Sequence, residues 1–312
     1  MMNTAAARDF SECGNKTGMV LLSVFQTHGK TWLSGSGADL VYTDKKRMGF
    51  MKLAANVSLM YGGMPVDRQL AHVAADGFRY VEMLAPYDMA PLQLAGKLSD
   101  HGLELVLINT PPGGTEYPMG VAAHPDLEGE FRAGMQRAAA VCDATGCRRV
   151  HVMTGHRLPD RPYQQQIDTL HHNLEWAHAQ FPELCFDLEA LNQADVEGYL
   201  YSNPGEVLAV LDGLDGIPVG MQFDFYHVVK EGLDIVSELA VCFSQVVHVQ
   251  VAGAPDRNEP DLSRDGVDTG FRFLHEAGYK GYVGLEYRPG QGAASKGLAW
   301  MVPLLERGWA SR

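Results

Sequence analysis

The sequence predicts an α/β protein that forms one (β/α)8 barrel, because strand-like and helix-like segments alternate eight times after Met51. Eight such units in about 260 residues match the usual size of this closed parallel barrel. An open doubly wound sheet usually has fewer strands and a glycine-rich nucleotide fingerprint, which this sequence lacks. The length of 312 residues suits one large domain, although length alone also allows two smaller ones.

The predicted strands share an apolar centre and turn residues at both ends, and they are Lys52–Met60, Phe78–Ala85, Glu104–Thr110, Arg149–Gly155, Leu184–Asn192, Gly220–His227, Gln245–Gly253 and Tyr282–Tyr287. Between them lie segments with apolar residues three and four positions apart, which is typical of helices packed on a core. Gln69–Ala75 and Phe131–Thr145 are examples, and Gly146 follows the second as a helix C-cap should.

Residues 1–50 differ from the rest of the chain. They are rich in Gly, Ser, Thr and Lys, and their one strand-like stretch is Met19–Gln26. We therefore predict an N-terminal extension, residues 1–50, followed by a single barrel domain, residues 51–312. We interpret the extension as poorly structured or as the product of an upstream start codon, with a functional arm as the alternative.

The charge and the cysteines restrict the partners and the compartment. A net charge of −13 and a pI near 5.3 argue against a nucleic-acid or anionic-membrane surface and favour a small-molecule partner. Five cysteines without a C-x-x-C pair indicate neither a disulfide framework nor a zinc ribbon, so we expect the reducing cytoplasm. No apolar run approaches the roughly 18 residues of a membrane span, and we expect no signal peptide. The oligomeric state stays open, a homo-oligomer included.

Oxygen-bearing side chains occupy the ends of the last four predicted strands, where a barrel of this kind places its active site: Glu189, Asp224, Gln250 and Glu286. Three carboxylates around one point repel each other unless a cation neutralises them. An all-oxygen set suits Mg²⁺ or Mn²⁺ better than zinc, so we predict a divalent metal site formed by these four residues. The alternative is that each carboxylate separately caps a helix or pairs with an arginine.

Three histidines lie on the same strands. We expect His227 in a rim loop, where it binds a substrate oxygen. His248 points the same way as Gln250 but one layer deeper, which favours a hydrogen-bonded core histidine that supports the ligands. The position of His151 fits the core and the pocket wall equally well.

Taken together, the chain resembles the hydroxypyruvate isomerase family, within the xylose isomerase-like TIM barrels, from Met51 to about Gly308. The matching strings are Ala54–Met60, Phe78–Glu82 with Pro86–Tyr87, Asn109–Gly113, Arg149–Gly155, Glu189 with Asn192, Met221–His227, His248–Gly253 with Glu259–Asp261, and Glu286–Pro289. Two places depart from the family pattern: Ala190 follows Glu189 where the family usually has proline, and the loop Leu262–Asp268 lacks the family's Gly-Glu and Asn-Tyr pairs. Because that loop would border the substrate, the metal ligands are better determined than the substrate.

The resemblance implies an isomerase of glyoxylate metabolism that interconverts hydroxypyruvate and tartronate semialdehyde through an enediolate. It implies the same four metal ligands, with Glu189 and Glu286 also transferring the proton. Among the cations that could bind the substrate carboxylate, Arg288 is preferred over Arg257 and Lys230.

Other readings remain open beside this one. A 2-oxo-tetronate isomerase would use the same ligands on an acid one carbon longer. A sugar epimerase would place His at Gln250, and an endonuclease-like metallohydrolase would add His and Asp ligands and a basic surface. A non-catalytic ligand-binding barrel would have lost the two glutamates.

Overall fold

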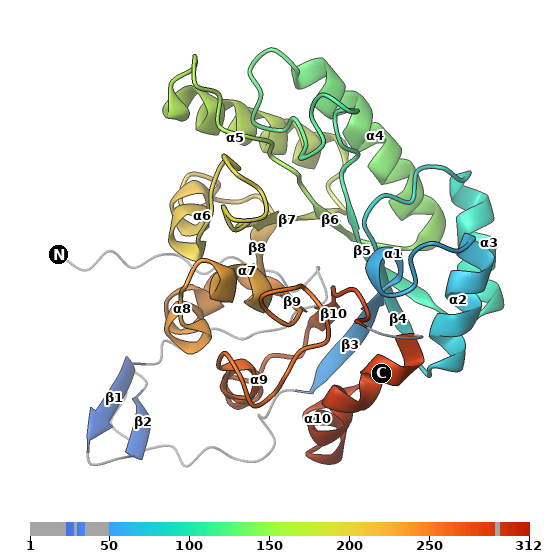
Figure 1. Ribbon diagram of the computed structural model, residues 1–312. Helices are drawn as coiled ribbons and strands as arrows, with labels where there is room; N and C mark the ends of the chain where they lie inside the picture. Colours follow the sequence, from blue (N-terminus) through green and yellow to red (C-terminus); the bar gives the residue numbers. More distant parts are fainter. Residues whose placement is uncertain (1–22, 28–29, 35–49, 291–293) are drawn as a thin grey trace.

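The computed structural model describes residues 23–27, 30–34, 50–290 and 294–312 of the chain (Figure 1). Most of the predicted extension, including the start of the strand-like stretch Met19–Gln26, lies outside the described residues. The described part forms an antiparallel hairpin of β1 (Ser23–Thr27) and β2 (Lys30–Ser34). The proposed boundary at Met51 therefore stays a prediction, although the first strand of the barrel does begin at that residue.

Eight parallel strands close into a barrel, as the sequence predicted. They follow one another in chain order, and β10 pairs back with β3 to close the ring. Their bounds are β3 (Met51–Asn56), β4 (Tyr80–Met83), β5 (Glu104–Asn109), β6 (Arg149–His151), β7 (Cys185–Glu189), β8 (Val219–Asp224), β9 (Val246–Val251) and β10 (Tyr282–Leu285), and the short β11 (Ala310–Ser311) adds to β3.

Most predicted strands are longer than the observed ones because the chain changes structure at their carboxyl ends. The first predicted strand, Lys52–Met60, ends at Asn56, whose side-chain oxygen accepts the Leu59 amide (3.1 Å) and starts a short helix. Strand β8, the sixth of the barrel, ends in the same way at Asp224, which caps the helix that follows. Polar residues at strand ends thus stop the sheet and turn the chain towards the loops.

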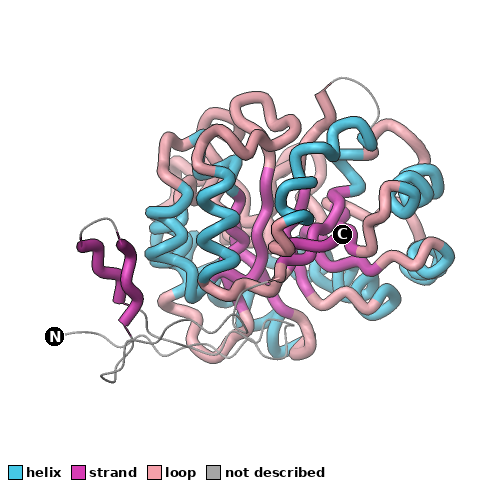
Figure 2. Tube along the Cα trace, turned by 90° about the horizontal axis from the view of Figure 1, so that it is seen from below, coloured by secondary structure: helices cyan, strands magenta, loops and turns pink. Residues whose placement is uncertain are grey.

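Helices cover the outside of the strands (Figures 1 and 2). They are α1 (Val57–Met60), α2 (Val66–Ala75), α3 (Pro91–Asp100), α4 (Glu128–Thr145), α5 (Tyr163–Gln180), α6 (Pro204–Leu211), α7 (Phe225–Lys230), α8 (Ile235–Cys242), α9 (Val267–Glu276) and α10 (Val302–Glu306), with 3₁₀ turns at Phe243–Gln245 and Ala294–Met301. The helix α4 ends at Gly146 as predicted, where φ is 78° and the amide bonds the Cys142 carbonyl. None of the helices in the described ranges is long and apolar enough to cross a bilayer.

Strand β9 illustrates how the sheet separates the apolar core from the barrel interior. All six of its residues are buried, but successive side chains point to opposite faces. Val249 and Val251 belong to the main hydrophobic core. His248 and Gln250 instead contact Glu82 of β4, which places them inside the barrel. The core between sheet and helices is therefore apolar, whereas the interior carries the polar side chains that build the site.

A chain that begins at Met51 should fold and melt like the full chain. Every barrel strand is kept, and Met51 itself donates to the Trp309 carbonyl (2.9 Å) within the barrel. We expect a Tm within about 2 °C of the full chain, since ~1 kcal/mol shifts the Tm of a domain of this size by that amount. As the control, a chain that begins at Val57 loses β3 and should not form the closed barrel. A decrease of many degrees on removing residues 1–50 would show that they stabilise it.

Candidate active site

The four predicted ligands lie at one end of the barrel. Glu189 and Asp224 end β7 and β8, Gln250 is the penultimate residue of β9, and Glu286 directly follows β10. Asp224 pairs in register with Gln250, whereas Glu189 pairs with Gln222 and Gln250 with Gly284, so each of the other two side chains is offset from its neighbour by two residues along the strands. All four are at most 5% exposed. One end of the barrel therefore carries a buried polar site.

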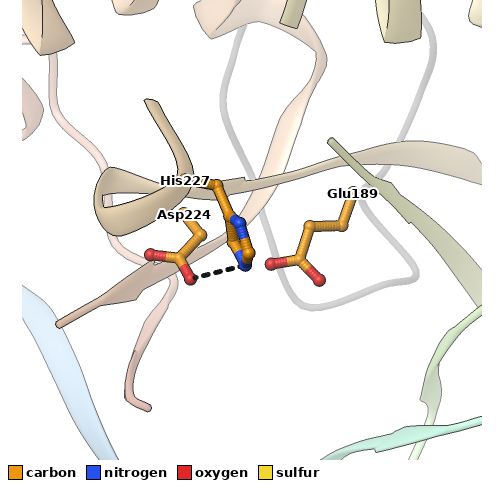
Figure 3. Close-up of side chains that lie close together, drawn as sticks. All are labelled: Glu189, Asp224 and His227. Atoms are coloured by element: carbon orange, nitrogen blue, oxygen red, sulfur yellow. Dashed lines mark ion pairs between the residues drawn. The ribbon is translucent and has the colours of Figure 1, made fainter. Parts of the chain in front are cut away.

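Three side chains converge on one point of this site (Figure 3). One donor atom each from Glu189, Asp224 and His227 lies within 4.8 Å of the others. Glu189 Oε1, Asp224 Oδ2 and His227 Nε2 are buried and have no hydrogen-bond partner within the described part of the chain. Because unpaired buried acceptors are costly, two carboxylate oxygens that share this defect fit a bound cation.

Arg257 supplies the positive charge nearest to the carboxylates. Its Nη2 lies 3.1 Å from Glu286 Oε1 and 3.8 Å from Asp224 Oδ2, and its guanidinium stands 5.1 Å from the centre of the Tyr226 ring. The backbone of Arg257 has a φ of 55°, a left-handed conformation that a non-glycine residue adopts at a cost. The loop after β9 thus folds so that this arginine reaches into the site.

Asp224 and Glu286 partly match the alternative to a metal site, in which each carboxylate separately caps a helix or pairs with an arginine. Asp224 Oδ1 accepts the Tyr226 amide (2.8 Å) and caps α7, while Glu286 pairs with an arginine. The second oxygen of Asp224, however, has no hydrogen-bond partner among the described residues, and its nearest cation is Arg257 at 3.8 Å. One oxygen of Asp224 can therefore cap the helix while the other is available to bind a cation.

Burial shifts the three strand-end carboxyl groups and the His227 ring towards their neutral forms. It raises the pKa of Glu189 well above its usual range, and the charges of Glu286 and Asp224 add to this effect. Burial also raises the pKa of Glu286 to about 8 and that of Asp224 to about 6, although Arg257 opposes both shifts. The pKa of His227 is lowered well below its usual value, again chiefly by burial. Without a further cation, the carboxylates hold protons more tightly than in water.

Asn56, Glu82 and His248 form a hydrogen-bonded layer, which we call the polar floor, beneath the four predicted ligands. Its central residue, Glu82, orients Gln250. The Gln250 amide donates to Glu82 Oε2 (2.9 Å), and its oxygen accepts from Gln222 Nε2 (2.7 Å). The other Glu82 oxygen pairs with His248 Nε2 (2.6 Å), and Asn56 Nδ2 lies 3.3 Å from Oε2. As predicted, His248 is a fully buried, hydrogen-bonded histidine.

Glu82 and Gln222 were not predicted as site residues. The available signal for Glu82 was a single acid within the otherwise apolar and aromatic segment Tyr80–Met83, and on its own such a residue says little about its partner. Its role emerges only from the barrel closure, because the His248 side chain that it contacts comes from a strand 166 residues later.

The remaining predicted residues differ in how close they lie to the ligands. His227 is in α7, not in a rim loop, because the helix capped by Asp224 begins directly after β8. His151 Nδ1 lies 3.6 Å from Glu189 Oε2, so it lines the site. The Arg288 side chain is exposed, whereas Lys230 pairs with Asp195 (3.3 Å). Of the three candidate cations, Arg257 is therefore the one that contacts the carboxylates.

A family model described as xylose isomerase-like TIM barrel matches residues 70–304. The chain belongs to this family. The family model spans α2 to α10 and thus includes all four predicted ligands. Membership in the xylose isomerase-like TIM barrels confirms the predicted fold and the family resemblance.

Two relatives that are similar in sequence are named as isomerases. The chain is 34% identical to a 2-oxo-tetronate isomerase of Cupriavidus necator, over 82% of this chain and 99% of the relative. It is 28% identical to a hydroxypyruvate isomerase of Escherichia coli, over 81% and 99% of the two chains. Among solved structures, an AP endonuclease family 2 protein from Brucella melitensis superposes with a TM-score of 0.76 at 31% identity, covering 81% and 99%. The named relatives support the predicted enzyme class, an isomerase.

Gly284 leaves the space that the Glu82 carboxylate occupies. A Cβ atom at position 284 would lie 1.8 Å from Glu82 Oε1. We expect Gly284→Ala to displace Glu82 and to reduce the free energy of unfolding by about 1–3 kcal/mol, the usual cost of overpacking a buried site. Urea unfolding measures the change.

Gly96→Ala is the matched control for this substitution. An added Cβ at Gly96, inside α3, meets nothing within 4 Å, so this change should be neutral or stabilise by up to about 1 kcal/mol. Equal stability of Gly284→Ala and the wild type would mean that the floor tolerates a shifted Glu82.

Proposed function

We propose that this protein is a metal-dependent isomerase that interconverts hydroxypyruvate and tartronate semialdehyde, or 2-hydroxy-3-oxopropanoate. The observation that carries the proposal is the convergence of unpaired, buried carboxylate oxygens of Glu189 and Asp224 beside Glu286 at the strand ends. The similarity to an Escherichia coli hydroxypyruvate isomerase supports the choice of substrate. Two buried glutamates in one site can carry out a reversible proton transfer between neighbouring carbons.

Glu189, Asp224, Gln250 and Glu286 would hold the divalent ion, Mg²⁺ or Mn²⁺. Glu189 and Asp224 offer free oxygens, and the oxygens of Gln250 and Glu286 would exchange their present partners Gln222 and Arg257 for the ion. All-oxygen ligands match the preference of these hard cations. A bound divalent ion supplies Lewis acidity, which makes the protons next to a carbonyl group more acidic.

Glu189 and Glu286 would move the proton. In hydroxypyruvate one glutamate, ionised at the start, would take the C3 proton, and the C3 hydroxyl proton would move to the C2 oxygen through an enediolate. The other glutamate, protonated at the start, would give its proton to C2, and a proton exchange between the two glutamates would restore the site. In the metal-free site, burial raises the pKa of Glu286 to about 8, so the surroundings of this carboxylate favour its binding a proton. The burial of both glutamates keeps water from competing for the proton.

Arg257 is the better candidate for binding the substrate carboxylate. It already pairs with the Glu286 carboxylate, and its side chain is 19% exposed at the edge of the buried site. Arg288 is exposed and follows Glu286 by two residues, so its side chain is less well placed to reach the same carboxylate. A guanidinium fork suits the planar carboxylate of a small oxo-acid.

A 2-oxo-tetronate isomerase is the second candidate. The 34% identity to the Cupriavidus necator enzyme favours it, and the same residues would act on an acid one carbon longer. An endonuclease activity is less well supported, because a net charge of −13 opposes DNA binding and the neutral Gln250 holds the fourth predicted ligand position.

Purified protein with Mg²⁺ or Mn²⁺ and a panel of three- and four-carbon oxo-acids, followed by proton NMR, tests the function. We expect conversion of hydroxypyruvate, loss of turnover after dialysis against a chelator, and recovery on adding metal. Faster conversion of 2-oxo-tetronate would select the second candidate. Full activity of a verified metal-free sample would contradict the metal-dependent mechanism.

Glu189→Gln and Glu286→Gln separate proton transfer from metal binding. Each variant keeps an oxygen that can coordinate the ion but loses the group that accepts a proton. We expect metal to remain partly bound while kcat falls about 10²- to 10⁴-fold or more, and the double variant to be little worse than the poorer single one. Near wild-type rates in both metal-saturated variants would disprove the two-glutamate mechanism.

Binding of the divalent ion should release protons. Because the pKa values of Asp224 and Glu286 are raised to about 6 and about 8, part of the cluster is protonated near neutral pH and must ionise to bind a cation. The affinity for Mn²⁺ should therefore rise as the pH rises from about 6 to about 8. Calorimetric titrations in two buffers of different ionisation enthalpy count the protons. A pH-independent affinity without proton release would argue against these ligands.

A further inference from the structure

His227 has an asymmetric environment that determines which ring nitrogen carries the proton. Its Nδ1 lies 3.0 Å from the backbone nitrogen of Asn192 and 2.7 Å from Asn192 Nδ2. A backbone N–H can only donate, so Nδ1 must accept with its lone pair. Nε2 has no hydrogen-bond partner among the described residues and points towards Asp224 and Glu189 (Figure 3).

The orientation of the Asn192 amide follows from the same reasoning. Asn192 Oδ1 accepts the backbone N–H of Asp195 (2.9 Å), which again can only donate. The amino group of Asn192 must therefore face His227 Nδ1 and Asp195 Oδ2 (3.1 Å). Asp195 in turn accepts from the Tyr226 hydroxyl (2.6 Å) and pairs with Lys230. We call these residues, Asn192, Asp195, Tyr226, His227 and Lys230, the Asn192 network. Each of their hydrogen-bonding groups can be assigned as a donor or as an acceptor without conflict.

We propose that the Asn192 network fixes His227 as the neutral tautomer with its proton on Nε2, so that His227 donates a hydrogen bond to a substrate oxygen and does not ligate the metal. A metal-ligating histidine must present a lone pair, and the only lone pair of this tautomer is engaged by Asn192. The Nε2–H group stands 3.7 Å from Asp224 Oδ2, a carboxylate that attracts a donor. Asn192 is then a positioning residue that acts through His227.

This inference rests on the proposed function and makes it more specific. The oxygens of a 2-oxo-3-hydroxy acid exchange carbonyl and hydroxyl character during the isomerisation, and negative charge develops on them in the enediolate. A fixed neutral donor stabilises that charge in both directions. Loss of one such donor typically costs about 10²- to 10³-fold in kcat.

The tautomer can be observed directly in the metal-free wild type. In protein labelled with ¹⁵N-histidine, a long-range ¹H–¹⁵N correlation spectrum near neutral pH distinguishes a protonated ring nitrogen from one with a lone pair, and His227→Gln assigns the signals. We expect a protonated Nε2 and an unprotonated Nδ1. A proton on Nδ1 would overturn the proposal. Absence of turnover on every oxo-acid combined with a protonated Nε2 would refute only the proposed function.

Two substitutions at Asn192 distinguish positioning from a general structural role. Asn192→Asp keeps the oxygen that accepts the Asp195 amide and the backbone N–H that faces Nδ1, but it replaces the side-chain donor with a carboxylate. This carboxylate competes with the backbone N–H for Nδ1, so part of the His227 population should carry its proton on Nδ1, and kcat should fall by up to about 10²-fold. Asn192→Ala keeps the backbone donor, so it should retain the wild-type tautomer and lose less activity. Equal losses in both variants with an unchanged ring spectrum would show that Asn192 is merely structural.

Asn203→Asp is the matched control. Asn203 also accepts a backbone amide three residues later, that of Glu206 (3.0 Å), as the cap of α6. Because no hydrogen bond joins Asn203 to a histidine in the described part of the chain, Asn203→Asp should change neither the His227 spectrum nor kcat. A response equal to that of Asn192→Asp would mean that any Asn-to-Asp exchange disturbs the barrel end and would overturn the assignment.

Discussion

Three buried carboxyl groups around one point impose the strongest constraint on this molecule. Deeper in the barrel, each buried acid has a basic partner: Asp187 pairs with Arg149 (2.6 Å), and Glu82 pairs with His248. At the strand ends, Glu189 shares with two further acids the single positive charge of Arg257. The imbalance of charge is therefore confined to one place, where protons or a bound cation must compensate for it. Concentrating uncompensated charge in this way costs stability and is typical of a functional site.

The polar floor determines the orientation of Gln250, the neutral residue among the four predicted ligands. Glu82 takes the Gln250 amide group as a donor, which turns the Gln250 oxygen towards Gln222 and away from the floor. This arrangement requires room inside the barrel, and Gly284 provides it because any larger residue would overlap Glu82. The lack of a side chain at Gly284 on β10 thus makes room for Glu82, and Glu82 in turn orients Gln250 on β9. Orientation by supporting hydrogen bonds of this kind is usual around metal sites.

The sequence predicted the barrel, and it predicted that four polar side chains lie at one end of it, because both depend on local periodicity. Alternating apolar runs identify strands, and the last polar residue of a strand such as Glu189 faces the site in any barrel of this kind. The identity of the contacting cation could not be predicted, since it depends on the left-handed backbone of Arg257 and the path of one loop. Glu82 was missed because its partner lies far away in the sequence. The helix that contains His227 was missed because a single cap, Asp224, decides where it begins.

Donors and acceptors are divided in a way that suits a reversible isomerisation. The strand-end carboxylates provide only acceptors, whereas Arg257 and, on our assignment, His227 provide only donors. Burial lowers the pKa of His227 well below its usual value, so the ring stays neutral and does not take up a second proton from the glutamates. Proton transfer is then left to the glutamates, and charge stabilisation to groups that keep their protons. Because neither role depends on which of the two carbons carries the carbonyl, the same site can serve both directions of the reaction.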